Sequence, residues 1–180
     1  MSLFNTKQKF GLLTKAFHWS IFLLITAQFF IIYRRTYFPK DAPEKLQYIL
    51  WHKSIGIMVL SLALLMLITR YIGHRPLFPK TMPPAHKTAA RFGHLALYAV
   101  LLLMPITGYL MSTFSGYAVS LLGWYDLPKL FGANKEFATL SFEIHRFTSY
   151  AVLTLVSGHI LAAFYHHFGL KDNVLKRMRF

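Results

Sequence analysis

The chain contains no cysteine among its 180 residues. This absence excludes disulfide bridges, thiolate metal sites and the thioether attachment of a cofactor through a C-x-x-C-H motif. Acidic residues are scarce as well, because six Asp and Glu residues face twenty Lys and Arg residues and leave a formal net charge of +14. Charged residues make up only 14% of the chain, whereas a soluble domain carries roughly 25%. The shortage of charge indicates a membrane protein.

Hydrophobic residues make up 55% of the chain and gather in four long runs, at about 15–34, 49–70, 89–113 and 142–168. Each run has the length of about 20 residues that a helix needs to cross a bilayer. The first run is too long for a cleaved signal peptide and lacks a cleavage motif. The connections are short enough for antiparallel neighbours. We therefore predict an all-α integral membrane protein, a single domain of residues 1–180 with four transmembrane helices in an up-down bundle.

The longest connection, residues 114–141, holds an apolar and aromatic segment at 117–130. This segment is too short to span a bilayer, and Trp124 and Tyr125 suit the level of the lipid headgroups. We predict an interfacial helix there.

The basic residues lie beside the apolar runs, which argues against nucleic acid as a partner and for contact with membrane lipid. The side with both termini and the 71–88 loop has twelve bases and one acid, and the other side has eight bases and five acids. Because Lys and Arg accumulate on the cytoplasmic side, we predict that both termini are cytoplasmic. The twelve bases are Lys7, Lys9, Lys15, Arg70, Arg75, Lys80, Lys87, Arg91, Lys171, Lys176, Arg177 and Arg179, and the eight are Arg34, Arg35, Lys40, Lys45, Lys53, Lys129, Lys135 and Arg146.

Two histidines, His145 and His159, stand fourteen positions apart in the last apolar run. Fourteen residues make nearly four helical turns, so both imidazoles leave the same face, ~21 Å apart along the axis. An ionisable side chain inside a membrane is costly and indicates a functional site. Neutral imidazole ligates haem iron, so one helix with two such ligands at two depths suggests two haems stacked across the membrane.

Depth gives each of these histidines a partner. His18 lies near the cytoplasmic start of the first run, at the depth of His159, and His52 opens the second run on the outer side, at the depth of His145. Two bis-histidine haem sites are therefore predicted, one in each leaflet. The alternatives are that a histidine is a satisfied polar residue at a helix contact, or that the set forms a di-metal site or a proton relay, although both of these need carboxylates inside the membrane.

The remaining histidines are less specific. His94 lies at a depth at which it could replace an inner ligand, contact a haem propionate or a quinone carbonyl, or simply pack. His166 and His167 are expected at the water interface, and His74 and His86 are expected in a loop without a special role.

Haem propionates need cations or hydrogen-bond donors near each membrane surface. Lys53 and Arg146 directly follow the two outer histidines, and Lys15 and Arg91 lie a few residues from inner ones. These four are candidate propionate partners. The alternative is that they are interfacial charges that extend to the headgroups.

The histidines fall in motifs that resemble the bacterial cytochrome b561 family over nearly the whole chain. The resemblance implies a four-helix di-haem b cytochrome of the inner membrane, in which His18 and His159 ligate the inner haem and His52 and His145 the outer one. It also implies quinone-linked electron transfer, and one branch of the family resembles superoxide:ubiquinone oxidoreductases. The motifs are FHW at 17–19, WHKSIG at 51–56, GHLALY at 93–98, PITG at 105–108, EIHR at 143–146, SGHILAAFYHH at 157–167 and LKDNVLKRM at 170–178.

Three functions fit the sequence. The first is a redox enzyme that takes electrons from a small periplasmic donor such as superoxide and reduces ubiquinone, with outer bases that steer the anionic donor. The second is a cytochrome b subunit that conducts electrons for a separate dehydrogenase or hydrogenase. The third is a membrane protein without redox activity, whose histidines only pack.

Overall fold

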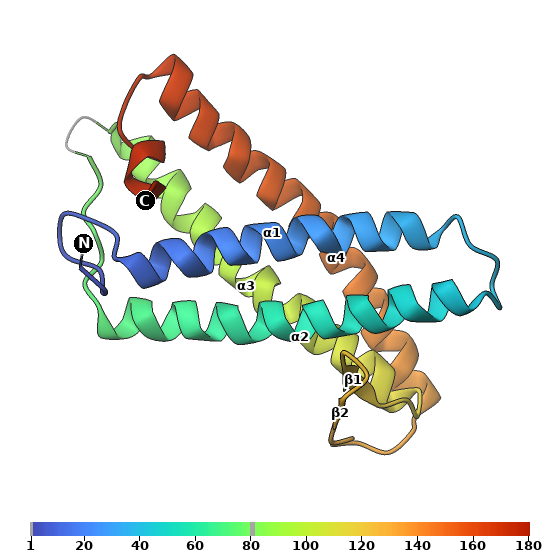
Figure 1. Cartoon of the computed structure of the whole chain (residues 1–180). Coiled ribbons are helices and arrows are strands. Elements are labelled where there is room, and N and C mark those ends of the chain that lie inside the picture. The colour runs from blue at the N-terminus through green and yellow to red at the C-terminus, as the bar shows by residue number, and fades with distance from the viewer. Residues whose placement is uncertain (1, 80–81) are drawn as a thin grey trace.

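Four long helices dominate the protein: α1 (Leu12–Arg35), α2 (Pro43–Ile72), α3 (Pro84–Phe114) and α4 (Lys135–Phe164) (Figure 1). The structure is a computed structural model that describes residues 2–79 and 82–180, so Lys80, which counted toward the orientation, lies outside it. Each helix is long and apolar enough to cross a membrane, α4 together with the π-helical turn η1 (Tyr165–Gly169). The four predicted runs lie within these segments, which confirms the all-α membrane fold.

Local sequence signals define the helix ends. Pro43 and Pro84 stand in the first turns of α2 and α3, where a missing N–H costs no helical hydrogen bond. Asn134 caps α4, because its side-chain oxygen accepts a hydrogen bond from the Phe137 N–H at 3.1 Å. Arg34 and Arg35 lie in the last turn of α1, where their positive charge interacts favourably with the negative end of the helix dipole.

The helices run up and down, so both termini and the C-terminal end of α2 lie at one end of the bundle (Figure 1). α1 packs against α2, α3 packs against α4, and α2 and α3 join these two pairs. In contrast, α1 and α4 make few or no close backbone approaches among the described residues. The bundle therefore consists of two helix pairs that are joined along one seam.

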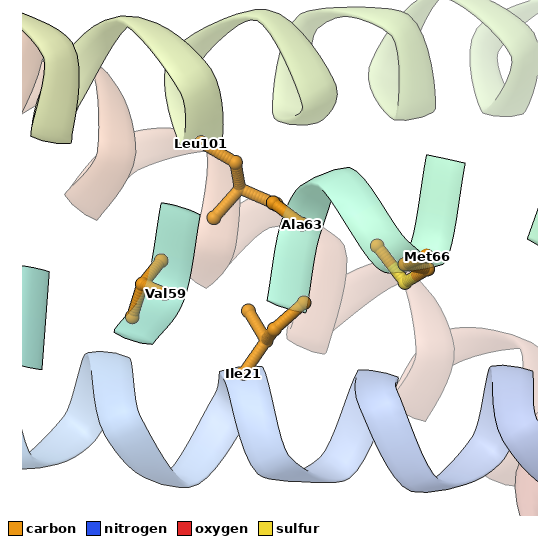
Figure 2. Packing of buried hydrophobic residues seen from close by; sticks show 5 residues of the cluster. All are labelled: Ile21, Val59, Ala63, Met66 and Leu101. Carbon is orange, nitrogen blue, oxygen red and sulfur yellow. The ribbon is translucent and has the colours of Figure 1, made fainter. Parts of the chain in front are cut away.

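A small apolar cluster forms this seam. Val59, Ala63 and Met66 of α2 lie between Ile21 of α1 and Leu101 of α3 (Figure 2). Most other large apolar side chains on the helices point outward, and Leu161 of α4, for example, is 66% exposed. An outward apolar surface is what lipid requires of a membrane helix.

The tail that follows η1 returns to the start of α1. The Trp19 Nε1–H donates to the Met178 carbonyl at 2.9 Å, and the Lys15 ammonium donates to the Arg179 carbonyl at 2.5 Å. The Arg177 guanidinium donates to the Gln8 carbonyl at 3.1 Å. These bonds tie the two terminal segments together at the end of the bundle that we predict to be cytoplasmic.

The predicted interfacial helix at 117–130 is wrong, because the segment forms a β-hairpin. Strand β1 (Val119–Leu121) pairs antiparallel with β2 (Tyr125–Leu127). Leu122 and Gly123 turn the chain with φ values of 56° and 80°, in the left-handed region that a helix cannot contain. Pro128 follows β2 and lacks the N–H that a helix would need. Apolar composition alone could not separate these two structures.

Ser54 of α2 fixes the hairpin to the bundle. Its side chain is fully buried, and its hydroxyl accepts a hydrogen bond from the Leu122 N–H at 2.8 Å. The hydroxyl also faces the carbonyls of Leu50 and Ser120, at 2.8 Å and 3.1 Å. Because Ser54 lies two residues after His52, the hairpin is held near the N-terminal end of α2.

The substitution Ser54→Ala should lower the free energy of unfolding by about 1–3 kcal/mol, because it leaves the Leu122 N–H without its partner. Thermal unfolding in detergent and hydrogen exchange at the Leu122 amide measure the effect. Ser61→Ala is the matched control, since the exposed Ser61 hydroxyl bonds only to the Ile57 carbonyl of its own helix. Equal effects of the two substitutions would contradict the role of Ser54.

Candidate functional site

The structure brings the two predicted outer histidines together. His52 of α2 and His145 of α4 have ring centres 6.1 Å apart, with the ring planes at 87°. Both side chains are partly buried between the helices. The depth argument from the sequence therefore matched residues that meet in space.

The ring of His145 is oriented by helix α3. Its Nδ1 lies 2.9 Å from the Met104 carbonyl oxygen and 3.3 Å from the Thr107 hydroxyl. Because a carbonyl only accepts, Nδ1 carries the proton, and the lone pair of the imidazole lies on Nε2. A metal-ligating histidine commonly has this kind of partner, which fixes its tautomer and orientation.

Gly108 makes room for this arrangement. A Cβ atom at Gly108 would lie 3.0 Å from Cε1 and 3.2 Å from Nδ1 of His145, closer than a side chain can normally approach. The PITG motif at 105–108 thus supplies a flat helix surface for the imidazole. Neither Thr107 nor Gly108 was singled out as a site residue from the sequence, although the motif itself was.

The predicted inner histidines also meet. The ring centres of His18 on α1 and His159 on α4 are 6.1 Å apart, with planes at 59°. His94 of α3 lies closer still, with its ring centre 5.5 Å from that of His159. The inner site therefore contains three histidines, and the role of His94 stays a prediction.

Two ring nitrogens at these sites are buried without a hydrogen-bond partner among the described residues, namely Nδ1 of His18 and Nδ1 of His52. A buried polar atom without a hydrogen bond is rare in native proteins and indicates a missing ligand or water. The Gln28 side chain contributes at the outer site, because its amide donates to the His52 backbone carbonyl at 2.8 Å.

The ring separation fits two imidazoles on opposite sides of one metal ion. Metal–imidazole bonds are about 2 Å long, so such ring centres stand roughly 6 Å apart. Among the described residues, no group of three or more His, Cys, Asp or Glu side chains could hold a bare metal ion. A pair of histidines suits a metal whose other ligands come from a macrocycle, as in haem. The residues present therefore fit haem.

Lys53 and Arg146, which follow the two predicted outer histidines, make different contacts. The Lys53 ammonium lies 5.9 Å from the centre of the Tyr117 ring. Arg146 is exposed and pairs with Glu143 at 2.6 Å on the surface of α4. The contact of Lys53 and Arg146 with haem propionates stays a prediction.

The expectation that His86 lies in a loop is wrong, because Pro84 starts α3 earlier than the apolar run does. The His86 ring lies 5.3 Å from that of His166, which is partly buried and donates a hydrogen bond to Asp172 at 2.5 Å. Burial alone would raise the pKa of Asp172, but the hydrogen bonds from His166 and the Val174 N–H outweigh it and lower that pKa. The separation of only six residues between His166 and Asp172 was the one sequence feature that could have suggested this contact.

The comparisons with known proteins agree with this geometry. The profile of the family described as prokaryotic cytochrome b561 matches residues 9–180. The chain belongs to this family. The family consists of membrane cytochromes that bind haem b and take part in electron transport, so the chain is a multi-pass bacterial membrane protein of this kind.

Three known proteins are similar to this chain over most of its length. Cytochrome b561 homolog 2 of Escherichia coli (strain K12) is 35% identical over 187 residues, which cover 99% of this chain and 95% of that protein. Cytochrome b561 homolog 1 of the same strain is 31% identical and covers 89% of this chain and 91% of its own length. A protein of Yersinia pestis named probable superoxide oxidase CybB is 28% identical, with 95% and 96% covered.

The substitution Gly108→Ala should displace His145, change the absorption spectrum of the haem-loaded protein and lower its unfolding temperature. Gly93→Ala on the same helix is the matched control, because a Cβ atom there meets nothing within 4 Å. The control should be neutral or stabilising by up to about 1 kcal/mol, since alanine favours a helix more than glycine does. Identical behaviour of the two variants in spectra and unfolding would refute the steric role of Gly108.

Proposed function

We propose that the protein is a di-haem b oxidoreductase that takes electrons from a small periplasmic donor, superoxide, and reduces ubiquinone in the membrane. The observation that carries the proposal is the presence of two histidine pairs with the same ring separation of 6.1 Å. The pairs stand at opposite ends of the bundle and share α4. Haem b, when bound, supplies one-electron transfer.

The ligands follow from these pairs. His18 and His159 hold the inner haem, and His52 and His145 hold the outer one. His145 is the ligand whose orientation has the clearest support, because Nδ1 faces the Met104 carbonyl and the lone pair lies on Nε2. His94 is assigned to a polar contact beside the inner haem.

Superoxide is proposed as the donor for two reasons. A relative is named a probable superoxide oxidase, and the outer end carries bases that attract a small anion. Lys53 directly follows His52, and α1 ends with Arg34 and Arg35. A field of this sign raises the encounter rate of an anion with the outer site.

The overall reaction needs two superoxide anions for each ubiquinone. Two superoxide anions each lose one electron and become dioxygen, and one ubiquinone takes both electrons and two protons and becomes ubiquinol. The orientation that follows from the basic residues, with both termini in the cytoplasm of a bacterium with an inner membrane, puts the His52–His145 pair toward the periplasm.

A second candidate function is a cytochrome subunit that serves a separate dehydrogenase or hydrogenase. The exposed hairpin favours it, because Trp124 at the turn is 95% exposed and Tyr125 is 61% exposed. A soluble partner could dock on such a surface. Co-purification of a stoichiometric soluble redox partner, with no reduction of haem by superoxide alone, would favour this candidate.

Removal of any one proposed ligand should remove one haem and keep the other. The variants are His18→Ala, His159→Ala, His52→Ala and His145→Ala, and His94→Ala should keep both haems. A pyridine haemochrome assay, together with oxidised and dithionite-reduced spectra of the purified protein, measures the number of haems per chain. His74→Ala is the matched control, because His74 is exposed in the connection after α2.

Two haems retained in any of the four ligand variants would show that its pair is wrong. A count of one haem in the wild-type protein would show that one of the two proposed sites does not exist. Loss of a haem in the His94→Ala variant would show that His94, and not His18, is the inner ligand. A chain that binds no haem would refute the proposal as a whole.

Neutralisation of outer bases should slow the reduction of haem by superoxide. The triple variant Arg34→Gln, Lys40→Gln, Lys45→Gln should lose at least roughly threefold in rate at low salt, and less at high salt, because salt screens long-range attraction. Stopped-flow absorbance with an enzymatic superoxide source measures the rate. The control is the inner triple variant Arg75→Gln, Lys171→Gln, Lys176→Gln, and equal rates in both triple variants would exclude steering by the outer bases.

A further inference from the structure

Arg70 is a cation to which the proposed function assigns no role. It stands in the last turn of α2, and its side chain is partly buried. Its guanidinium carbon lies 5.1 Å from the centre of the Tyr98 ring on α3, and Nη1 lies 3.4 Å from the Tyr98 hydroxyl oxygen. The side chain thus turns toward the neighbouring helix rather than along its own helix to water.

Arg70 and Tyr98 adjoin the inner histidines. Tyr98 follows His94 by one helical turn, so both side chains share a face of α3. Tyr98 packs against the apolar cluster that includes Ile21, which lies one turn after His18 on α1.

The guanidinium has no carboxylate partner among the described residues. The ion pairs there join Arg146 to Glu143 and His166 to Asp172. An unpaired charge between membrane helices is costly and indicates a functional site. The contact with Tyr98 is a cation–π contact and a long hydrogen bond, so guanidinium donors remain for an anionic oxygen ligand.

The other inner cations that the sequence offered as propionate partners are engaged elsewhere. The Lys15 ammonium donates to the Arg179 carbonyl at 2.5 Å. The Arg91 guanidinium lies 5.8 Å from the centre of the Phe78 ring, and its side chain is exposed. Of the cations discussed for this end, Arg70 is therefore the one that contacts the face of α3 shared by Tyr98 and His94.

We propose that Arg70 and Tyr98 bind a carboxylate, namely a propionate of the haem held by His18 and His159. A guanidinium matches a carboxylate with two parallel hydrogen bonds, and the Tyr98 hydroxyl adds a third donor beside it. The inference rests on the proposed function, because it requires haem at the inner site. It adds an anchor for the propionate that differs from the predicted candidates Lys15 and Arg91.

The test uses the full chain with His52→Ala, which keeps only the inner haem under the proposed function. In this background Arg70→Gln should lower the midpoint potential, because the lost positive charge had stabilised the reduced haem. We expect at least a threefold shift in the reduction equilibrium, which is about 30 mV for a one-electron couple. Redox difference infrared spectra of protein loaded with haem that carries ¹³C in its propionate carboxyls should show a shifted carboxylate band.

Three further variants separate a specific anchor from a general effect on folding. Arg70→Lys keeps the charge and should restore most of the potential, while the labelled band stays altered because the two parallel bonds are lost. Tyr98→Phe removes only the hydroxyl and should shift the labelled band with the haem retained. Arg75→Gln, an exposed base five residues along the chain, should change neither the potential nor the band.

The outcomes distinguish this inference from the proposed function. If the His52→Ala background binds no haem, both fail. If it binds haem, but Arg70→Gln and Tyr98→Phe leave the potential and the labelled band unchanged, the inference alone fails. If these variants weaken only the apparent affinity for ubiquinone, the ligand is a quinone oxygen, and the propionate assignment is overturned.

Discussion

Imidazole nitrogens inside an apolar helix bundle need partners, because the surrounding lipid offers none. This constraint organises the protein. His145 and His159 lie fourteen residues apart on α4, and each meets a histidine from another helix at 6.1 Å between ring centres. Nδ1 of His18 and of His52 nevertheless has no hydrogen-bond partner in the part of the chain that the structure describes. Among the described residues, packing alone therefore leaves these Nδ1 atoms without a hydrogen bond.

The two ends of the bundle treat their histidines differently. At the outer site α3 presents a flat surface, where Gly108 leaves space for the His145 ring and the Met104 carbonyl fixes its tautomer. At the inner site α3 instead presents His94, whose ring approaches His159 to 5.5 Å. The same helix therefore orients a proposed ligand at one depth and adds a polar side chain at the other. Hydrogen bonds and charge set the potential of a haem, so two sites built in this way should differ in potential.

The sequence was sufficient for the features that depend on composition and helical period. Four apolar runs predicted the four spanning helices, and the depth of His18 and His52 predicted their partners on α4. It failed where a single backbone conformation decides, as at Leu122, whose left-handed φ turns the expected interfacial helix into a hairpin. It also could not predict the contact of Arg70 with Tyr98, because helices that are apolar on all sides do not reveal how they are rotated against each other. The assignment of haem ligands rests on both sources together.

The packing of the helices gives the proposed haems a structural consequence. α1 and α2 form one pair, α3 and α4 form the other, and the apolar cluster around Ala63 joins them. In a membrane this cluster gains little from the hydrophobic effect, because lipid is as apolar as the helix interior. Ligation by His18 and His159 would bridge α1 to α4, and ligation by His52 and His145 would bridge α2 to α4. A group that binds only the folded state stabilises it in proportion to its affinity, so on this assignment haem holds the two pairs together as well as carrying the electrons.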